Sequence, residues 1–244
     1  MALNKYPSVF NTSVRFRQSL GMEEKEVVSF FTEVMKSMPD FQNYRRTEDD
    51  FHLYQEVAGS PVRQLLVRDK GITLAVASSI SPADAEAIAR SVYSLISQHL
   101  HPSLLVIELI DVSFRFTFRH KGNQDLLVLS GLFGETPYAA IATGIEGAVR
   151  DFQPRLGLSL DADHSTVAVL DITTGTTVGE IETGNFGARD IRVECGVAKT
   201  KGLTQQDMAT TFAVLFRDAT RFIEERVAPL LLDRLSQAVI GDAQ

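Results

Sequence analysis

The sequence predicts an α+β protein, in which amphipathic helices pack on one face of an antiparallel sheet. Short segments alternate apolar and polar side chains, as half-buried strands do, and residues typical of turns separate them. Longer segments carry apolar side chains at helical spacing. Because the order strand, helix, several strands, helix occurs twice, we expect two β-α-β(3-4)-α pseudo-repeats. They cover residues 1–102 and 103–244 and together form one compact unit.

The first half begins with a strand and a helix. Residues 14–17 alternate apolar and arginine side chains, which is typical of a half-buried strand. A helix is expected at residues 23–38, because acidic residues precede a stripe of apolar side chains. The stripe consists of Val27, Phe30, Phe31, Val34, Met35 and Met38. Such a stripe predicts packing in the core.

Three strands of an antiparallel meander are expected next, at residues 51–57, 62–68 and 72–77, with turn residues between them. A second helix follows with a well-marked start. Ser81 can cap this helix, and Pro82 occupies its first position, where proline is favoured. Its predicted buried face carries Ile88, Val92, Ile96 and Leu100.

The second half is expected to repeat this order. A strand is predicted at residues 112–119, of which residues 114–119 repeat the alternation of apolar and arginine side chains seen at residues 14–17. A helical or mixed region covers residues 124–148. Further strands are expected at residues 155–160, 166–172 and 191–198, with residues 177–182 as an additional candidate.

The last predicted element is a long helix from Thr204, its N-cap, to Val239. Pro229 is expected to bend or split this helix, because proline removes a backbone donor and clashes with the preceding turn. If the two halves are related, their strands form one antiparallel sheet with the helices on one face. The opposite face is then partly free, and it becomes a candidate binding surface.

This order of elements resembles the duplicated fold of the TATA-box-binding protein at the level of topology. The resemblance implies the fold and not DNA binding, since the chain matches no motif of that family. From about residue 51 to residue 118, and in its C-terminal helix, the chain also resembles a sporadically distributed, uncharacterised family of bacterial proteins of about this length. That family implies no activity.

The composition of the chain indicates where in the cell we expect the protein. The chain has a net charge of −7, which favours solubility and argues against nucleic-acid binding through overall charge. Its single cysteine, Cys195, cannot form an internal disulfide, and the N-terminal segment lacks the apolar core of a signal peptide. No apolar run approaches the roughly 18 residues of a membrane span. We therefore expect a cytoplasmic protein that does not enter the membrane.

Basic side chains on the predicted strands form the first candidate site. If they share the free sheet face, they could pair with a phosphate backbone or an acidic peptide. The alternative is that each arginine pairs with Asp or Glu on a neighbouring strand. The candidates are Arg15, Arg17, Arg115, Arg119, Arg155, Arg192 and Lys199, with His120 and Lys121 at the rim.

Acidic side chains form the second candidate site. Asp161 and Asp163 precede His164, and Asp171 follows the next strand. Carboxylates at strand ends could hold a hard divalent metal and support hydrolysis. The alternative is a solvated turn, in which Asp accepts hydrogen bonds from its own backbone.

Sequence motifs for nucleophilic, phosphate-binding, dinucleotide-binding and zinc sites do not occur in the chain. We therefore predict a non-enzymatic interaction or assembly subunit without a cofactor. Its partner is a protein, either a second copy or another chain, bound through the open sheet face, the sheet edges or the C-terminal helix. Two alternatives stay open: a nucleic-acid-binding protein that uses the strand arginines, and a metal-dependent hydrolase centred on Asp161, Asp163 and Asp171.

Overall fold

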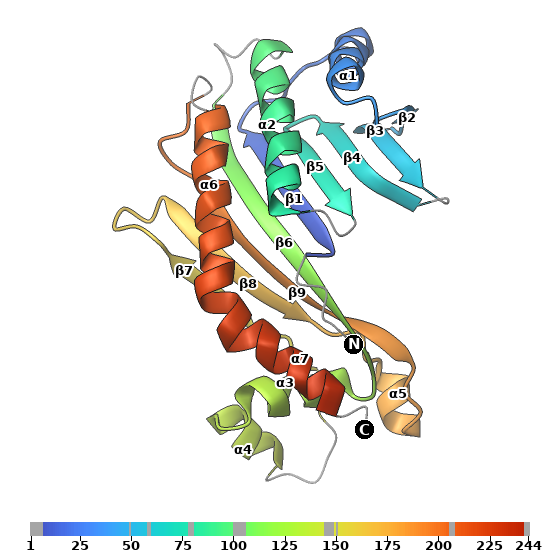
Figure 1. The fold of residues 1–244 in the computed structure, drawn as a ribbon, viewed down its shortest axis with the longest axis vertical. Coiled ribbons are helices and arrows are strands. Elements are labelled where there is room, and N and C mark those ends of the chain that lie inside the picture. The colour runs from blue at the N-terminus through green and yellow to red at the C-terminus, as the bar shows by residue number, and fades with distance from the viewer. Residues whose placement is uncertain are drawn as a thin grey trace.

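In the part of the chain that the structure describes, nine antiparallel strands form one sheet in the order β2-β3-β4-β5-β1-β6-β9-β8-β7 (Figure 1). The computed structural model describes residues 7–48, 50–57, 60–77, 81–99, 106–143, 149, 151–204 and 208–241. The strands are β1 (Val9–Phe16), β2 (Asn43–Arg46), β3 (Asp50–Val57), β4 (Ser60–Arg68), β5 (Gly71–Ala77), β6 (Ile107–Lys121), β7 (Arg155–Ser159), β8 (Thr166–Thr173) and β9 (Ala188–Lys199).

Helices pack on this sheet and on one another. They are α1 (Glu24–Ser37), α2 (Pro82–His99), α3 (Gln124–Phe133), α4 (Pro137–Thr143), α5 (Val178–Thr183), α6 (Met208–Phe222), the π-helix η2 (Ile223–Leu232) and α7 (Asp233–Gly241). Helices α2 and α6 lie side by side across one face of the sheet (Figure 1). The predicted α+β class, an antiparallel sheet with helices packed on it, is confirmed. None of the helices in the described ranges is long and apolar enough to cross a bilayer.

The two halves share one apolar core. Strands β1 and β6 pair at the centre of the sheet, and there the ring of Phe10 lies 5.4 Å from that of Phe114. Phe216 of α6 packs against both rings. Between the helices, Tyr93 of α2 stacks on Phe212 of α6 at a centroid distance of 4.8 Å. The buried side chains form a contiguous cluster across both halves. The duplication itself stays a prediction.

Strand β6 shows why the sheet has two different faces. Its side chains alternate, so that Phe116 and Phe118 are buried under the helices while Thr117 and Arg119 are exposed on the other side. Arg115 lies on the same side as Thr117 and is half-buried. We call this second side, which carries Arg115, Thr117 and Arg119, the free face. The alternation of phenylalanine and arginine in the sequence therefore places arginines on the free face.

Two elements differ from the sequence prediction. Residues 177–182, expected as an additional strand, form the N-cap and the first five of the six residues of helix α5. The backbone N–H of Thr177 donates to the Glu180 carboxylate at 2.9 Å, and the Thr177 hydroxyl accepts from the N–H of Glu180, which fixes a helical first turn. Strand β2 was not expected, because it has four residues and is mostly exposed. The last helix is described from Met208 onward; residues 205–207, which follow its predicted N-cap Thr204, lie outside the described residues.

Candidate binding groove

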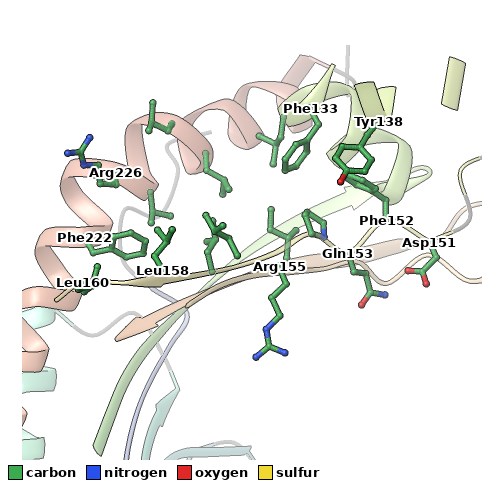
Figure 2. A pocket seen from close by; sticks show the side chains of 18 residues that line it. Phe133, Tyr138, Asp151, Phe152, Gln153, Arg155, Leu158, Leu160, Phe222 and Arg226 are labelled. Atoms are coloured by element: carbon green, nitrogen blue, oxygen red, sulfur yellow. The ribbon is translucent and has the colours of Figure 1, made fainter. Parts of the chain in front are cut away.

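A groove of about 1000 Å³ lies between the outer strands of the second half and the C-terminal helices (Figure 2). Its floor is the helix-facing side of β7 and β8. On β7, every second side chain is a leucine that points to this side, because strand side chains alternate. The apolar side chains of the floor are Leu156, Leu158, Leu160, Leu170 and Ile172. We call this cavity the leucine groove.

The end of α6 and the π-helix η2 form the wall of the leucine groove. Pro229 lies within η2 and cannot donate a backbone hydrogen bond, so a regular α-helix cannot continue through it. The helix here adopts the wider π-type turn. Phe222, Arg226 and Leu230, spaced four residues apart, all line the groove. The disturbance expected at Pro229 is therefore a π-helix, and this helix shapes the wall.

Aromatic side chains close one end of the leucine groove. The ring of Phe152 lies 5.3 Å from that of Phe133 on α3 and 6.3 Å from that of Tyr138 on α4. Asp125, which is only 1% exposed, holds this end in place. Its Oδ1 accepts hydrogen bonds from the backbone N–H of Phe152 at 3.0 Å and from the hydroxyl of Thr174 at 2.6 Å. One buried carboxylate thus connects α3 to the aromatic end of the groove.

Large apolar side chains of the leucine groove are accessible to solvent. Leu156, Leu158 and Leu160 are 48%, 39% and 44% exposed, respectively. Tyr138 and Leu230 are 65% and 61% exposed. Neighbouring apolar side chains that stay accessible are typical of a surface that binds another molecule.

Charged side chains border the groove. Figure 2 shows Arg226 at the η2 side and Asp151 at the end near Phe152. Arg155 points away from the floor, toward the free face, where its Nε lies 3.9 Å from Oδ2 of Asp171. Arg226 is exposed and forms no ion pair with any residue that the structure describes. It is therefore a cation available to a ligand at the rim.

Besides Arg155, three of the arginines proposed from the sequence form ion pairs with acidic side chains. Arg115 and Arg119 pair with residues directly opposite them on β9. Exposed pairs of this kind contribute about 0–1 kcal/mol to stability. These three arginines are therefore arranged as in the alternative interpretation, in which each arginine pairs with Asp or Glu on a neighbouring strand. The N–O distances are 3.1 Å for Arg15–Glu108, 3.1 Å for Arg115–Glu194 and 3.4 Å for Arg119–Asp190.

The remaining basic candidates are arranged differently. Within the described ranges, Arg17, Lys121 and Arg192 form no ion pair. Arg192 lines a polar hollow of about 310 Å³ together with Arg119. His120 is 6% exposed and lies on the helix-facing side rather than at the rim, because it is one residue out of phase with Arg119. Ligand binding by these side chains, including binding of nucleic acid, stays a prediction.

Of the three aspartates proposed for a metal site, Asp161 and Asp163 lie together in the loop before β8, and Asp171 lies apart from them on β8. The hydroxyl of Ser165 donates to Asp161 at 2.7 Å, and with the N–H of Thr166 it holds the pKa of Asp161 well below its usual range. Asp163 accepts from the N–H of Ser165. Asp171 lies five residues beyond Thr166, about 17 Å along the strand. No three His, Cys, Asp or Glu side chains in the described ranges are placed to hold a metal.

Asp111 is a half-buried acid on β6, opposite Ser13 of β1. Burial raises the pKa of Asp111 above its ordinary value of 3.8, and a hydrogen bond from the Ser13 hydroxyl at 2.5 Å offsets part of this shift. Arg15 also favours the ionised form, whereas the charge of Glu194 disfavours it. The net effect is a raised pKa of Asp111 in the folded protein, so that folding favours the protonated carboxyl group.

The Asp111→Asn variant should therefore become more stable relative to the wild type as the pH rises from about 4 to 7. A carboxyl with a raised folded-state pKa binds more protons in the folded than in the unfolded protein, so wild-type stability falls as pH rises through that pKa. Asparagine does not titrate and escapes this loss. Urea unfolding of both proteins at pH 4 and pH 7 measures the difference. A wild type that gains relative to the variant would contradict the raised pKa.

The sequence locates β7 but does not indicate the leucine groove. The only signal in the sequence is the leucine at every second position from Leu156 to Leu160, which is also what a covered strand would carry. That these leucines are accessible depends on where the helices pack. No protein-family model matches the chain, and no curated protein is similar to it in sequence.

Proposed function

We propose that this protein is a non-enzymatic binding subunit that holds an apolar segment of another polypeptide in the leucine groove. The observation that carries the proposal is the row of three accessible leucines, Leu156 and Leu158 on β7 and Leu160 just after it, which line the groove together with the accessible Leu230 of η2. A partner that covers these side chains removes apolar area from water, which is favourable by about 25 cal/mol per Å².

The open edge of the sheet supports a polypeptide as the ligand. Strand β7 pairs only with β8, and all five of its residues are exposed. Edge strands present unpaired N–H and C=O groups to other chains. At the opposite edge, Arg45 and Arg46 of β2 are charged, and Arg46 pairs with Glu24 of α1. At the β2 edge the one large apolar side chain that is exposed, Tyr44, lies among charged residues, whereas the β7 edge combines accessible backbone with a row of accessible leucines.

Photo-crosslinking from the floor of the leucine groove tests the proposal. The photoreactive residue p-benzoylphenylalanine is placed at position 158 of the full-length chain, which is expressed in the cells that naturally produce it. Because Leu158 is 39% exposed, this substitution should be tolerated by the fold. We expect irradiation to give a discrete covalent adduct with a polypeptide, detected by its mass and identified from its peptides.

The matched control carries the same photoreactive residue at Thr117, which is exposed on the free face. This position should give little or none of the adduct. Equal yields from both positions would mean that the partner does not select the groove. A second variant carries the photoreactive residue at position 230, because Leu230 is 61% exposed on the opposite wall. If neither position 158 nor position 230 gives an adduct while both variants melt like the wild type, the proposed function is wrong.

A further inference from the structure

In the N-terminal half, helix α1 covers the outer strands of the sheet. Phe30 and Phe31 of α1 are buried, and the sheet residues Leu53 and Leu65 of the same core cluster are 0% exposed. Phe31 also packs edge-on against Tyr44 of the edge strand β2, with ring centroids 5.9 Å apart. Helix α1 also lies next to α2 (Figure 1). This amphipathic helix therefore fills the space between α2 and the edge of the sheet.

In the second half, no described helix covers the outer strands in this way. Helix α3 packs against α7, and both α3 and α4 lie beyond the end of the sheet (Figure 1). Leu156 and Leu158 are therefore 48% and 39% exposed, whereas Leu53 and Leu65 are fully buried. The leucine groove lies beside α6 and over the outer strands of the second half. Helix α1 lies in the same way beside α2 and over the outer strands of the N-terminal half.

We infer that the leucine groove binds an amphipathic α-helix of a separate partner protein, an inference that rests on the proposed function. The floor is a sheet and the wall is a helix, which is the environment that α1 occupies. From Leu156 to Leu160 the floor extends about 14 Å. About nine helical residues cover this length, enough for apolar side chains at i, i+3, i+4 and i+7.

The charges at the rim indicate what the partner helix carries on its polar side. In the N-terminal half, Glu24 of α1 pairs with Arg46 of β2 at 2.5 Å, which fixes the first turn of the helix to the sheet edge. Arg226 at the rim of the leucine groove has no ion pair with any described residue. Arg226 lies on the wall of the groove and not on the sheet edge, but it offers the same kind of pairing to an acidic residue on the partner helix. The partner segment thus combines an apolar stripe with at least one carboxylate beside it.

Other polypeptide segments fit the groove less well. In a second copy of this chain, helices α1, α2 and α6 bury their apolar stripes in their own core. Helix α4 exposes Tyr138 and Ile141 but has only seven residues. A strand added to β7 would satisfy the open edge, but it would lie beside the floor and leave the leucines of β7 accessible.

Crosslink mapping from two positions distinguishes a helix from a strand. The photoreactive residue is placed at position 156 or at position 160 of the full-length chain, in its native cells. Tandem mass spectrometry then identifies the partner residue that each position captures. The two positions are about 14 Å apart. That distance corresponds to about seven to nine residues of a helix, depending on its tilt, and to about four residues of a strand.

We expect the two captured residues to differ by about seven to nine positions in the partner sequence. A synthetic peptide of the captured segment should then bind Arg226→Glu about tenfold more weakly than the wild type, and Arg226→Lys nearly as well as the wild type. A difference of four positions, peptides that come only from this chain, or equal binding by Arg226→Glu would overturn the inference. These outcomes leave the proposed function intact, whereas the absence of any adduct contradicts the proposed function itself.

Discussion

Replacing Phe114 with alanine should lower the free energy of unfolding by about 3–5 kcal/mol. Phe114 is 2% exposed, and its ring packs against Phe10 of β1 and Phe216 of α6 at 5.4 and 5.6 Å. Alanine leaves a cavity where the two halves meet. Domains are usually stable by about 5–15 kcal/mol, so this loss is a large share of the total. Guanidinium denaturation followed by circular dichroism and tyrosine fluorescence measures it.

The same experiment tests whether the halves unfold together. If they share one core, both probes should report a single transition that moves as a whole in Phe114→Ala. Val214→Ala on α6 is the control, because Val214 is 41% exposed and its truncation should change stability by no more than about 0.5 kcal/mol. Two transitions, of which Phe114→Ala shifts only one, would contradict a shared core.

Elements that carry their own local pattern could be predicted from the sequence. Helix α2 begins where Ser81 and Pro82 indicate, and the Ser81 hydroxyl accepts the N–H of Asp84 at 3.1 Å. The alternating phenylalanines and arginines of β6 likewise predict a strand with one buried face. Strand β2 has no such pattern, since its four residues are mostly exposed. Helix α5 depends on the reciprocal Thr177 and Glu180 bonds, which override the β-branched residues around them.

The candidate site depends on contacts between distant segments, so the sequence could not predict it. Arg115 and Glu194 are 79 residues apart and meet only because β6 and β9 pair in one register. A one-residue slip would place their side chains on opposite faces. The leucines of β7 are accessible because α3 packs against α7 and not on the sheet. Nothing in the sequence of β7 itself specifies that arrangement.

Replacing Asp125 with alanine should lower the free energy of unfolding by about 2–4 kcal/mol and should also reduce photo-crosslinking from position 158. Alanine removes the carboxylate that accepts two hydrogen bonds. The N–H of Phe152 and the hydroxyl of Thr174 then lack this acceptor. Each unsatisfied group costs about 1–3 kcal/mol when it is buried, and the expected loss lies in the lower part of the sum because Phe152 and Thr174 are only half-buried. Phe152 forms one end of the leucine groove. Without its hydrogen bond to Asp125, Phe152 should move and change where the partner segment binds. Denaturation and adduct yield measure the two effects.

Asp125→Asn separates these hydrogen bonds from the charge. Both bonds end on Oδ1 of Asp125, and the carbonyl oxygen of asparagine can accept both in the same position. The variant loses only the favourable charge in the first turn of α3, worth about 0.3–1 kcal/mol, and should crosslink like the wild type. Equal losses in the two variants would assign the effect to the charge. A destabilised alanine variant with an unchanged adduct yield would mean that Phe152 does not shape the groove.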